Sequence, residues 1–127
     1  MAMAPDLVGS HRGKVIEADT TALLASFDGP TRAIRCSAAM AFHVSRAGSR
    51  PRIGVHTGEC ETVGAKVSGS AVEIAKQLME QAQPGEVLAT QTVRGLVTGS
   101  GFAFARRGLH AFPGGAGELR VYAVTST

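Results

Sequence analysis

The segment Leu23–Met40, LLASFDGPTRAIRCSAAM, contains most of a strand, a tight turn and the first part of a helix. Residues 21–27 are mostly apolar on both faces of an extended chain, which is typical of a strand covered on both sides. Asp28-Gly29-Pro30 predicts the start of a helix. Proline is favoured in the first turn because the N–H that it lacks would have no hydrogen-bond partner in the helix. A strand that turns directly into a helix indicates a domain in which helices pack on a sheet.

The helix that follows Pro30 is predicted to end at Gly48. It carries an apolar stripe on one side and basic side chains on the other, the pattern of a helix with one buried face. The stripe consists of Ala33, Ile34, Ala38, Ala41 and Val44, and the other side carries Arg32, Arg35, His43 and Arg46.

The rest of the chain also alternates between strands and helices. A strand is predicted over residues 14–18, and residues 52–64 are predicted to form one long strand bent at its glycines. A second helix is predicted from Ser70 to Gln83, with Ala71, Val72, Ala75, Leu78 and Met79 facing inward. The remaining elements are a strand at 86–90, a short helix at 91–97 and closing strands at 102–108 and 118–124. The fold class is therefore α/β (α+β), a sandwich of helices on a mainly antiparallel sheet.

Length and composition predict a single domain over residues 1–127, with residues 1–11 as a loose tail or arm. The chain is 44% hydrophobic and 18% charged, which excludes a strongly disordered protein. The longest weakly polar stretch, residues 36–44, is about half of the ~20 residues that a membrane span requires. The N-terminal sequence has no basic start followed by an apolar core, as a signal peptide would. We therefore expect a cytoplasmic protein with no membrane partner.

Short motifs do not identify a function. The net charge of +3 is not gathered into a patch with interleaved aromatic residues, so we do not expect nucleic-acid binding. GECETVGAK at residues 58–66 is not a phosphate loop, because five residues separate its glycines and no Lys directly follows the second. Cys36 and Cys60 lack metal-ligand spacing and are predicted to be free thiols. His56 is predicted to be a strand histidine with a satisfied hydrogen bond rather than a catalytic base.

A longer pattern resembles a known family. The segments 23–40, RIGVHTGE (52–59) and 69–97, followed by the closing strands, together resemble the class III nucleotidyl cyclase catalytic domain, in its bacterial branch. The resemblance covers residues 12–124, and FDGPTRAIRCS and PGEVLATQTVRGLV are its most specific parts. It implies a ferredoxin-like antiparallel sheet with C-terminal strand additions, in a head-to-tail dimer with active sites between two chains. One chain of the family supplies two metal-binding Asp residues, and its partner supplies a purine-reading pair together with an Asn and an Arg.

Measured against this family pattern, the chain lacks the groups that bind metal and phosphate. The turn that carries the second metal Asp falls on residues 20–22, and Thr21 at its centre cannot replace a bridging carboxylate. Glu73 occupies the Asn position on the second helix, and Gln77 occupies the Arg position. Removal of one such electrostatic group typically costs ~10²–10³ in rate. We therefore expect no catalytic residue, no metal site and no cofactor, with Mg²⁺ or Mn²⁺ relevant only if residual cyclase activity exists.

The purine-reading positions are Glu17 and Lys66, where the adenine-reading form has Lys and Asp. One interpretation is a vestigial pair across an abandoned pocket, contributing only ~0–1 kcal/mol. Another is guanine recognition by Glu17, because the guanine-reading branch has Glu at this position. Asp19 lies two positions from Thr21 and is the alternative metal ligand.

The resemblance thus predicts a degenerate cyclase homology domain that lacks the family's first strand. Its predicted role is non-catalytic dimerisation or regulation in cyclic-nucleotide signalling, as a homodimer or as a heterodimer with another cyclase-type domain, with weak nucleotide binding left open. The alternative is a weak class III cyclase that converts ATP or GTP to the cyclic 3′,5′-monophosphate and pyrophosphate. A missing central strand leaves backbone groups unpaired, so we expect a dimer interface to protect them.

Overall fold

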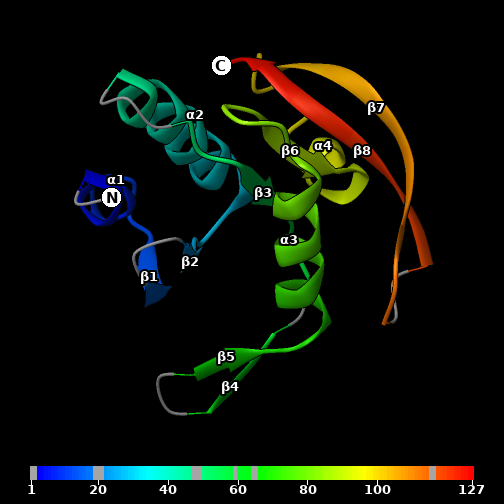
Figure 1. The fold of residues 1–127 in the computed structure, drawn as a ribbon, viewed down its shortest axis with the longest axis horizontal. Coiled ribbons are helices and arrows are strands. Elements are labelled where there is room, and N and C mark those ends of the chain that lie inside the picture. The colour runs from blue at the N-terminus through cyan, green and yellow to red at the C-terminus, as the bar shows by residue number, and fades with distance from the viewer. Residues whose placement is uncertain (1–2, 19–21, 47–49, 59, 64–65, 115–116) are drawn as a thin grey trace.

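The computed structural model describes residues 3–18, 22–46, 50–58, 60–63, 66–114 and 117–127, with only the backbone described at 3–4, 44–46, 62–63 and 66–67. The helices are α1 (Met3–Ser10), α2 (Pro30–Arg46), α3 (Ser70–Gln81) and α4 (Gln91–Leu96). The strands are β1 (Lys14–Ala18), β2 (Leu23–Ser26), β3 (Ile53–Val55), β4 (Glu61–Val63), β5 (Lys66–Ser68), β6 (Val87–Thr90), β7 (Ala103–Phe112) and β8 (Gly117–Ser126). The mixture confirms the predicted α+β class (Figure 1).

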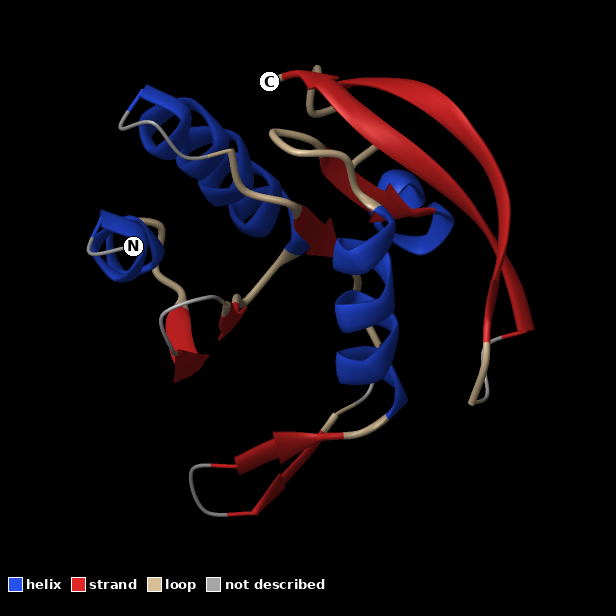
Figure 2. Cartoon of the chain, in the orientation of Figure 1, coloured by secondary structure: helices blue, strands red, loops and turns tan. Residues whose placement is uncertain are grey.

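The strands form three separate sheets. β1 pairs with β2, β4 pairs with β5, and the remaining strands form a four-stranded sheet in the order β3-β6-β8-β7. Strands β3 and β6 are parallel, whereas the other described pairs are antiparallel. Figure 2 shows the long β7–β8 pair curving past α4, which contacts β8. The sheets are therefore mainly antiparallel, as the sequence predicts.

The single long strand predicted over residues 52–64 is wrong. Strand β3 ends at Val55, and β4 starts at Glu61 in a different sheet. Gly58, between the two strands, lies against α3, since a Cβ there would be 3.1 Å from the Ala71 Cβ. The chain then leaves the four-stranded sheet, and β4 forms a hairpin with β5 that the sequence analysis did not anticipate.

Helix α2 buries two faces rather than the one predicted stripe. Ile34 is fully buried in a cluster with Val55 of β3, and Ala33 and Ala41 pack against that cluster. Cys36 and Met40 face a second cluster. Their exposed fractions are only 1% and 9%, so this face is as much part of the core as the first.

The N-terminal residues differ from the loose arm predicted for residues 1–11. Residues 3–10 form α1, and Val8 is 1% exposed because it packs against Cys36 and Met40 of α2. The Val8 carbonyl also accepts a 2.8 Å hydrogen bond from the Gly13 N–H, which directs the chain into β1. Burial of an apolar side chain against α2 therefore orders this segment.

Helix α3 packs on β3 with almost no space between the backbones. A Cβ on Gly54 would lie 2.6 Å from the Met79 nitrogen and 2.7 Å from the Ala75 carbonyl oxygen. The predicted inward set is confirmed at three buried positions, Ala71, Val72 and Leu78, and a fourth, Ile74, was missed. None of the described helices is long and apolar enough to cross a membrane.

Candidate functional site

Helix α3 presents two of the predicted site residues on one side, since Glu73 and Gln77 are about one turn apart. The Glu73 carboxylate is exposed in the first turn, where a negative charge interacts favourably with the helix dipole. Gln77 is half-buried, and its Nε2 donates a 3.1 Å hydrogen bond to the carbonyl oxygen of Pro113. The Gln77 amide is thus held against the segment between β7 and β8, and neither position carries a positive charge.

The other predicted site residues lie on different elements. Glu17 is exposed on β1, next to an irregularity in the β1–β2 register between Val15 and Glu17. The backbone of Lys66 begins β5 opposite Val63, but its side chain lies outside the described residues, as does the predicted Glu17–Lys66 pair. Thr21 and the alternative ligand Asp19 also lie outside the described residues. The structure therefore brings together Glu73 and Gln77 on α3, while Glu17 is placed on the separate β1–β2 hairpin.

The resemblance implies a metal site held by two Asp carboxylates. Within the described ranges, no three His, Cys, Asp or Glu side chains lie close enough together to hold a metal ion. Thr21 and Asp19, the positions that the resemblance relates to the metal, lie outside these ranges.

A buried polar contact joins the ends of the two parallel strands. His56 follows β3 directly, and its Nδ1 lies 2.7 Å from the Oγ1 of Thr90 at the end of β6. Thr90 is fully buried, and burial also lowers the pKa of His56. This confirms the prediction that His56 makes a hydrogen bond. Thr90 follows Ala89, and Ala89 lies opposite Val55 in the parallel pair. The signal that could have pointed to Thr90 is therefore its position at the end of a second buried strand.

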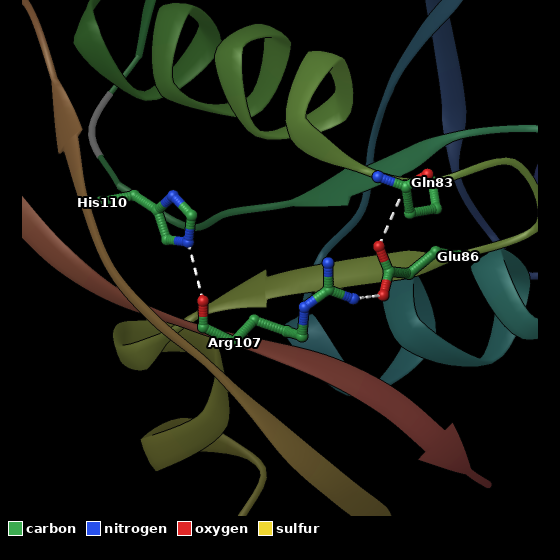
Figure 3. Close-up of polar contacts among 4 residues, drawn as sticks. All are labelled: Gln83, Glu86, Arg107 and His110. Carbon is green, nitrogen blue, oxygen red and sulfur yellow. Dashed lines mark hydrogen bonds and ion pairs between the residues drawn. The ribbon is translucent and has the colours of Figure 1, made fainter.

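A second polar group ties β7 to the turn between α3 and β6 (Figure 3). Glu86 accepts a 2.9 Å hydrogen bond from the Gln83 backbone N–H through one carboxylate oxygen and forms an ion pair with Arg107 through the other. The carbonyl oxygen of Arg107 lies 2.8 Å from the Nε2 of His110. Each group has a partner within the chain, so the arrangement is typical of a structural network.

Several arginine side chains contact groups of the same chain. The Arg94 guanidinium lies 5.0 Å from the Tyr122 ring centre and 5.8 Å from that of Phe104. Arg35 lies 5.7 Å from the ring centre of Phe102. These cation–π contacts place the charges of Arg35 and Arg94 over aromatic rings in β7, in β8 and directly before β7. The two charges do not form one continuous basic groove.

The sequence matches no family model and no curated protein, but its fold matches many solved structures. The adenylate/guanylate cyclase/hydrolase of Silicibacter pomeroyi aligns with a TM-score of 0.82 at 20% identity, over 97% of this chain and 78% of that one. The adenylyl cyclase CyaB of P. aeruginosa aligns with a TM-score of 0.82 at 18% identity, over 99% and 78%. The catalytic core of a rhodopsin-guanylyl cyclase with converted specificity, in complex with ATPalphaS, aligns with a TM-score of 0.84 at 16% identity, over 98% and 78%. The chain has the class III nucleotidyl cyclase fold.

This cyclase fold confirms the architecture that the sequence resemblance implies. The hairpin β1–β2, the helix α2 and the strand β3 follow in the expected order, and α3 carries both of the helix positions singled out, Glu73 and Gln77. The residues on the cyclase-like scaffold that sequence reasoning did not identify are Thr90, Glu86 and Arg107, and all three make contacts within the chain.

Proposed function

We propose that this chain is a non-catalytic cyclase-like domain that acts by associating with a second cyclase-type domain in cyclic-nucleotide signalling. The observation that carries the proposal is the contact of Gln77. The resemblance assigns this position to an Arg that faces the phosphates, whereas the Gln77 amide donates to the carbonyl oxygen of Pro113. A neutral amide engaged in this way supplies no fixed positive charge for the negative charge that develops during phosphoryl transfer.

The electrostatics of α3 support the same conclusion. The carboxylate of Glu73 is exposed about one turn before Gln77, so this side of the helix presents a negative charge where a nucleotide triphosphate would need donors. The resemblance also assigns Thr21 to a metal-binding Asp position. Loss of a cation, gain of an anion and loss of a metal ligand act in the same direction, and together they would abolish turnover.

The dimeric architecture that the resemblance implies supports a role in association. In cyclases each active site takes residues from two chains, and this chain matches neither contribution. A solved neighbour, the guanylyl cyclase domain of a fusion protein from Blastocladiella emersonii, is a non-canonical dimer. If this chain instead pairs head to tail with an intact cyclase domain, as the resemblance implies, both composite sites are incomplete, and the complex is inhibited.

Catalytic inactivity is tested by incubating the full chain at high concentration with ATP or GTP and excess Mn²⁺, and measuring cyclic nucleotide. An active cyclase and the heat-denatured chain serve as controls. We expect no product above the denatured control. Metal-dependent product that rises with protein concentration would overturn the proposal of inactivity.

Association is tested separately by light scattering over a wide range of protein concentrations. We expect a concentration-dependent dimer. A monomer at every concentration would rule out the homodimer. The heterodimer would then be tested by adding the chain to an intact cyclase, and an unchanged cyclase activity would rule it out.

The weak cyclase remains the second candidate, and the exposed carboxylate of Glu17 favours it. An exposed carboxylate on β1 is chemically suited to accept hydrogen bonds from guanine, and a solved neighbour from Catenaria anguillulae is a guanylate cyclase domain in complex with GTP. In the assay above, cyclic GMP formation that is lost in Glu17→Gln would establish this alternative.

A further inference from the structure

Strands β7 and β8 have one face that α3 does not cover. Leu119 and Val121 of β8 pack against side chains of α3. Helix α4 packs on the opposite face, where its Val93 belongs to the cluster that Phe104 joins. Figure 1 shows the β7–β8 pair continuing past α4. Beyond this short helix, the side chains of the opposite face, which we call the α4 face, are therefore exposed to solvent.

Three arginine side chains gather on the α4 face around Tyr122. The guanidinium of Arg94 in α4 lies 5.0 Å from the centre of the Tyr122 ring. Arg106 of β7 is directly opposite Tyr122 in the strand register, and Arg120 lies two residues before Tyr122 on β8. Directly opposed residues and residues two apart share a face of a sheet, so Arg106 and Arg120 extend from the same face as Tyr122. The three arginines come from three different elements, and the sequence therefore does not show them as a cluster.

A small cavity lies beside these side chains. The strand register shifts between Arg106 and Leu109, and Gly108 within the shift has a φ of 91°, as a β-bulge requires. The cavity at this bulge has a volume of about 70 Å³. It is lined by Arg106, Gly108, Leu109, Arg120, Val121 and Tyr122. This volume holds about five water-sized groups, which is the number of heavy atoms in a phosphate group.

The positive charge at this cavity has no matching carboxylate. Within the described part of the chain, no carboxylate forms an ion pair with Arg94, Arg106 or Arg120. Glu118 is on the same face, but it lies opposite Ala111, on the far side of Arg120 from Tyr122. Like charges on neighbouring strands repel each other, and guanidinium groups are suited to bidentate contact with phosphate oxygens. An oxyanion in the cavity would therefore offset the repulsion between the arginines.

We infer that the α4 face binds a dianionic phosphate group, either free or as the phosphomonoester of a small molecule. Arg106 and Arg120 hold the phosphate oxygens, and the Tyr122 hydroxyl is a further donor at the cavity. Arg94 holds the Tyr122 ring and adds a third positive charge. Leu109, which is 55% exposed and lines the cavity, contacts the carbon group of a phosphomonoester. The inference does not depend on the proposed function, because anion binding requires neither turnover nor association.

The test is titration calorimetry of the full chain with inorganic phosphate and with phenyl phosphate, at low ionic strength because salt screens exposed charges. We expect one saturable site for both probes. Arg106→Gln and Arg120→Gln should each weaken binding by about tenfold or more, because each removes a charged donor. Tighter binding of phenyl phosphate, with the difference lost in Leu109→Ser, would support the site and assign it to a phosphomonoester. Equal affinities would support the site and assign it to free phosphate.

Arg107→Gln is the matched control for charge. It makes the same substitution at the next residue, but the Arg107 guanidinium is paired with Glu86, as Figure 3 shows. We expect its affinity to stay within about twofold of that of the original chain. No saturable binding, unchanged binding in both Arg106→Gln and Arg120→Gln, or an equal loss in Arg107→Gln would each overturn the inference.

A second measurement needs no substitution. On addition of inorganic phosphate, the backbone amide resonances of residues 106–109 and 120–122 should shift in NMR spectra of the full chain, and shifts confined to other residues would overturn the inference. A single-stranded oligonucleotide that binds about tenfold more tightly than phenyl phosphate and needs the same arginines would assign the cluster to nucleic acid, and would also overturn it.

Discussion

The Nδ1 of His56 and the Oγ1 of Thr90 lie 2.7 Å apart and close a polar contact between the ends of two parallel strands. Thr90 is fully buried, and His56 is half-buried beside it. The contact is therefore part of the core of the four-stranded sheet, and its chemistry determines how the fold responds to pH and to substitution.

Acid is expected to destabilise the protein through His56. Burial lowers the pKa of this histidine from 6.5, so the unfolded chain binds a proton more readily than the folded chain. Its stabilising contribution is complete above pH 6.5 and is lost as the pH falls through the folded-state pKa. Urea unfolding at a series of pH values from 7.5 downward checks this. In His56→Gln the free energy of unfolding should fall less over the same range, and an identical pH dependence would contradict the assignment.

The Thr90 hydroxyl is expected to stabilise the fold through the same contact. Thr90→Val keeps the shape of the side chain but leaves the imidazole nitrogen without its partner, at a cost of about 1–3 kcal/mol in the free energy of unfolding. Thr90→Ser retains the hydroxyl and serves as the matched control. In urea denaturation, the free energy of unfolding should be lower for Thr90→Val than for Thr90→Ser. The opposite order would show that the hydrogen bond is not the important contact.

A methyl group at position 54 is expected to disrupt the packing of α3 on β3. The Cβ of Gly54→Ala would meet two backbone atoms of α3, at Met79 and Ala75, and backbone cannot move aside like a flexible side chain. Overpacking of this kind costs about 1–3 kcal/mol. Gly95→Ala in α4, where a new Cβ meets no atom within 4 Å, is the control and should be neutral or stabilising. Equal thermal stability of the two variants would rule out the close approach.

The Glu86 carboxylate is expected to contribute more through its backbone contact than through its ion pair. Glu86→Gln retains an acceptor for the Gln83 N–H and removes only the charge that pairs with the 37%-exposed Arg107, at a cost of ~0–1 kcal/mol. Glu86→Ala removes both contacts and should cost about 0.5–1.5 kcal/mol more. Asp28→Asn breaks an exposed 4.0 Å pair with Arg32 and should leave stability nearly unchanged. Chemical denaturation should show the largest loss in the free energy of unfolding for Glu86→Ala and the smallest for Asp28→Asn. A larger loss for Asp28→Asn than for the Glu86 variants would contradict this order.

The two cysteines are expected to differ in reactivity. Cys60 is exposed, whereas Cys36 is buried, and burial raises the pKa of the Cys36 thiol. A thiol reagent should therefore modify one cysteine rapidly in the folded chain and the second only when the chain unfolds. Cys60→Ser should abolish the rapid phase, and a rapid phase that persists in this variant would place Cys36 at the surface.

The elements predicted best are those with a strong local signal. Pro30 at the start of α2 and the apolar repeat of α3 are readable because helix starts and apolar faces depend on nearby residues. The prediction of one strand over 52–64 was wrong because β4 pairs with β5 in a separate sheet and Gly58 approaches α3, and both contacts involve later parts of the chain. The burial of Cys36, Met40 and Val8 was not predicted for the same reason, since α1 and the β1–β2 hairpin, which pack against this second face of α2, are separate elements of the chain.

The sequence by itself determined the α+β class and the locations of helices α2, α3 and α4 and of strands β1, β2, β6, β7 and β8. Each of these follows from local patterns of apolar, turn-forming and charged residues. Only the tertiary structure decided that His56 meets Thr90, that Gln77 is held by Pro113, and that β2 and β3 lie in separate sheets above one apolar cluster. These relationships join residues far apart in the chain, and long-range packing, which local sequence does not encode, brings them together.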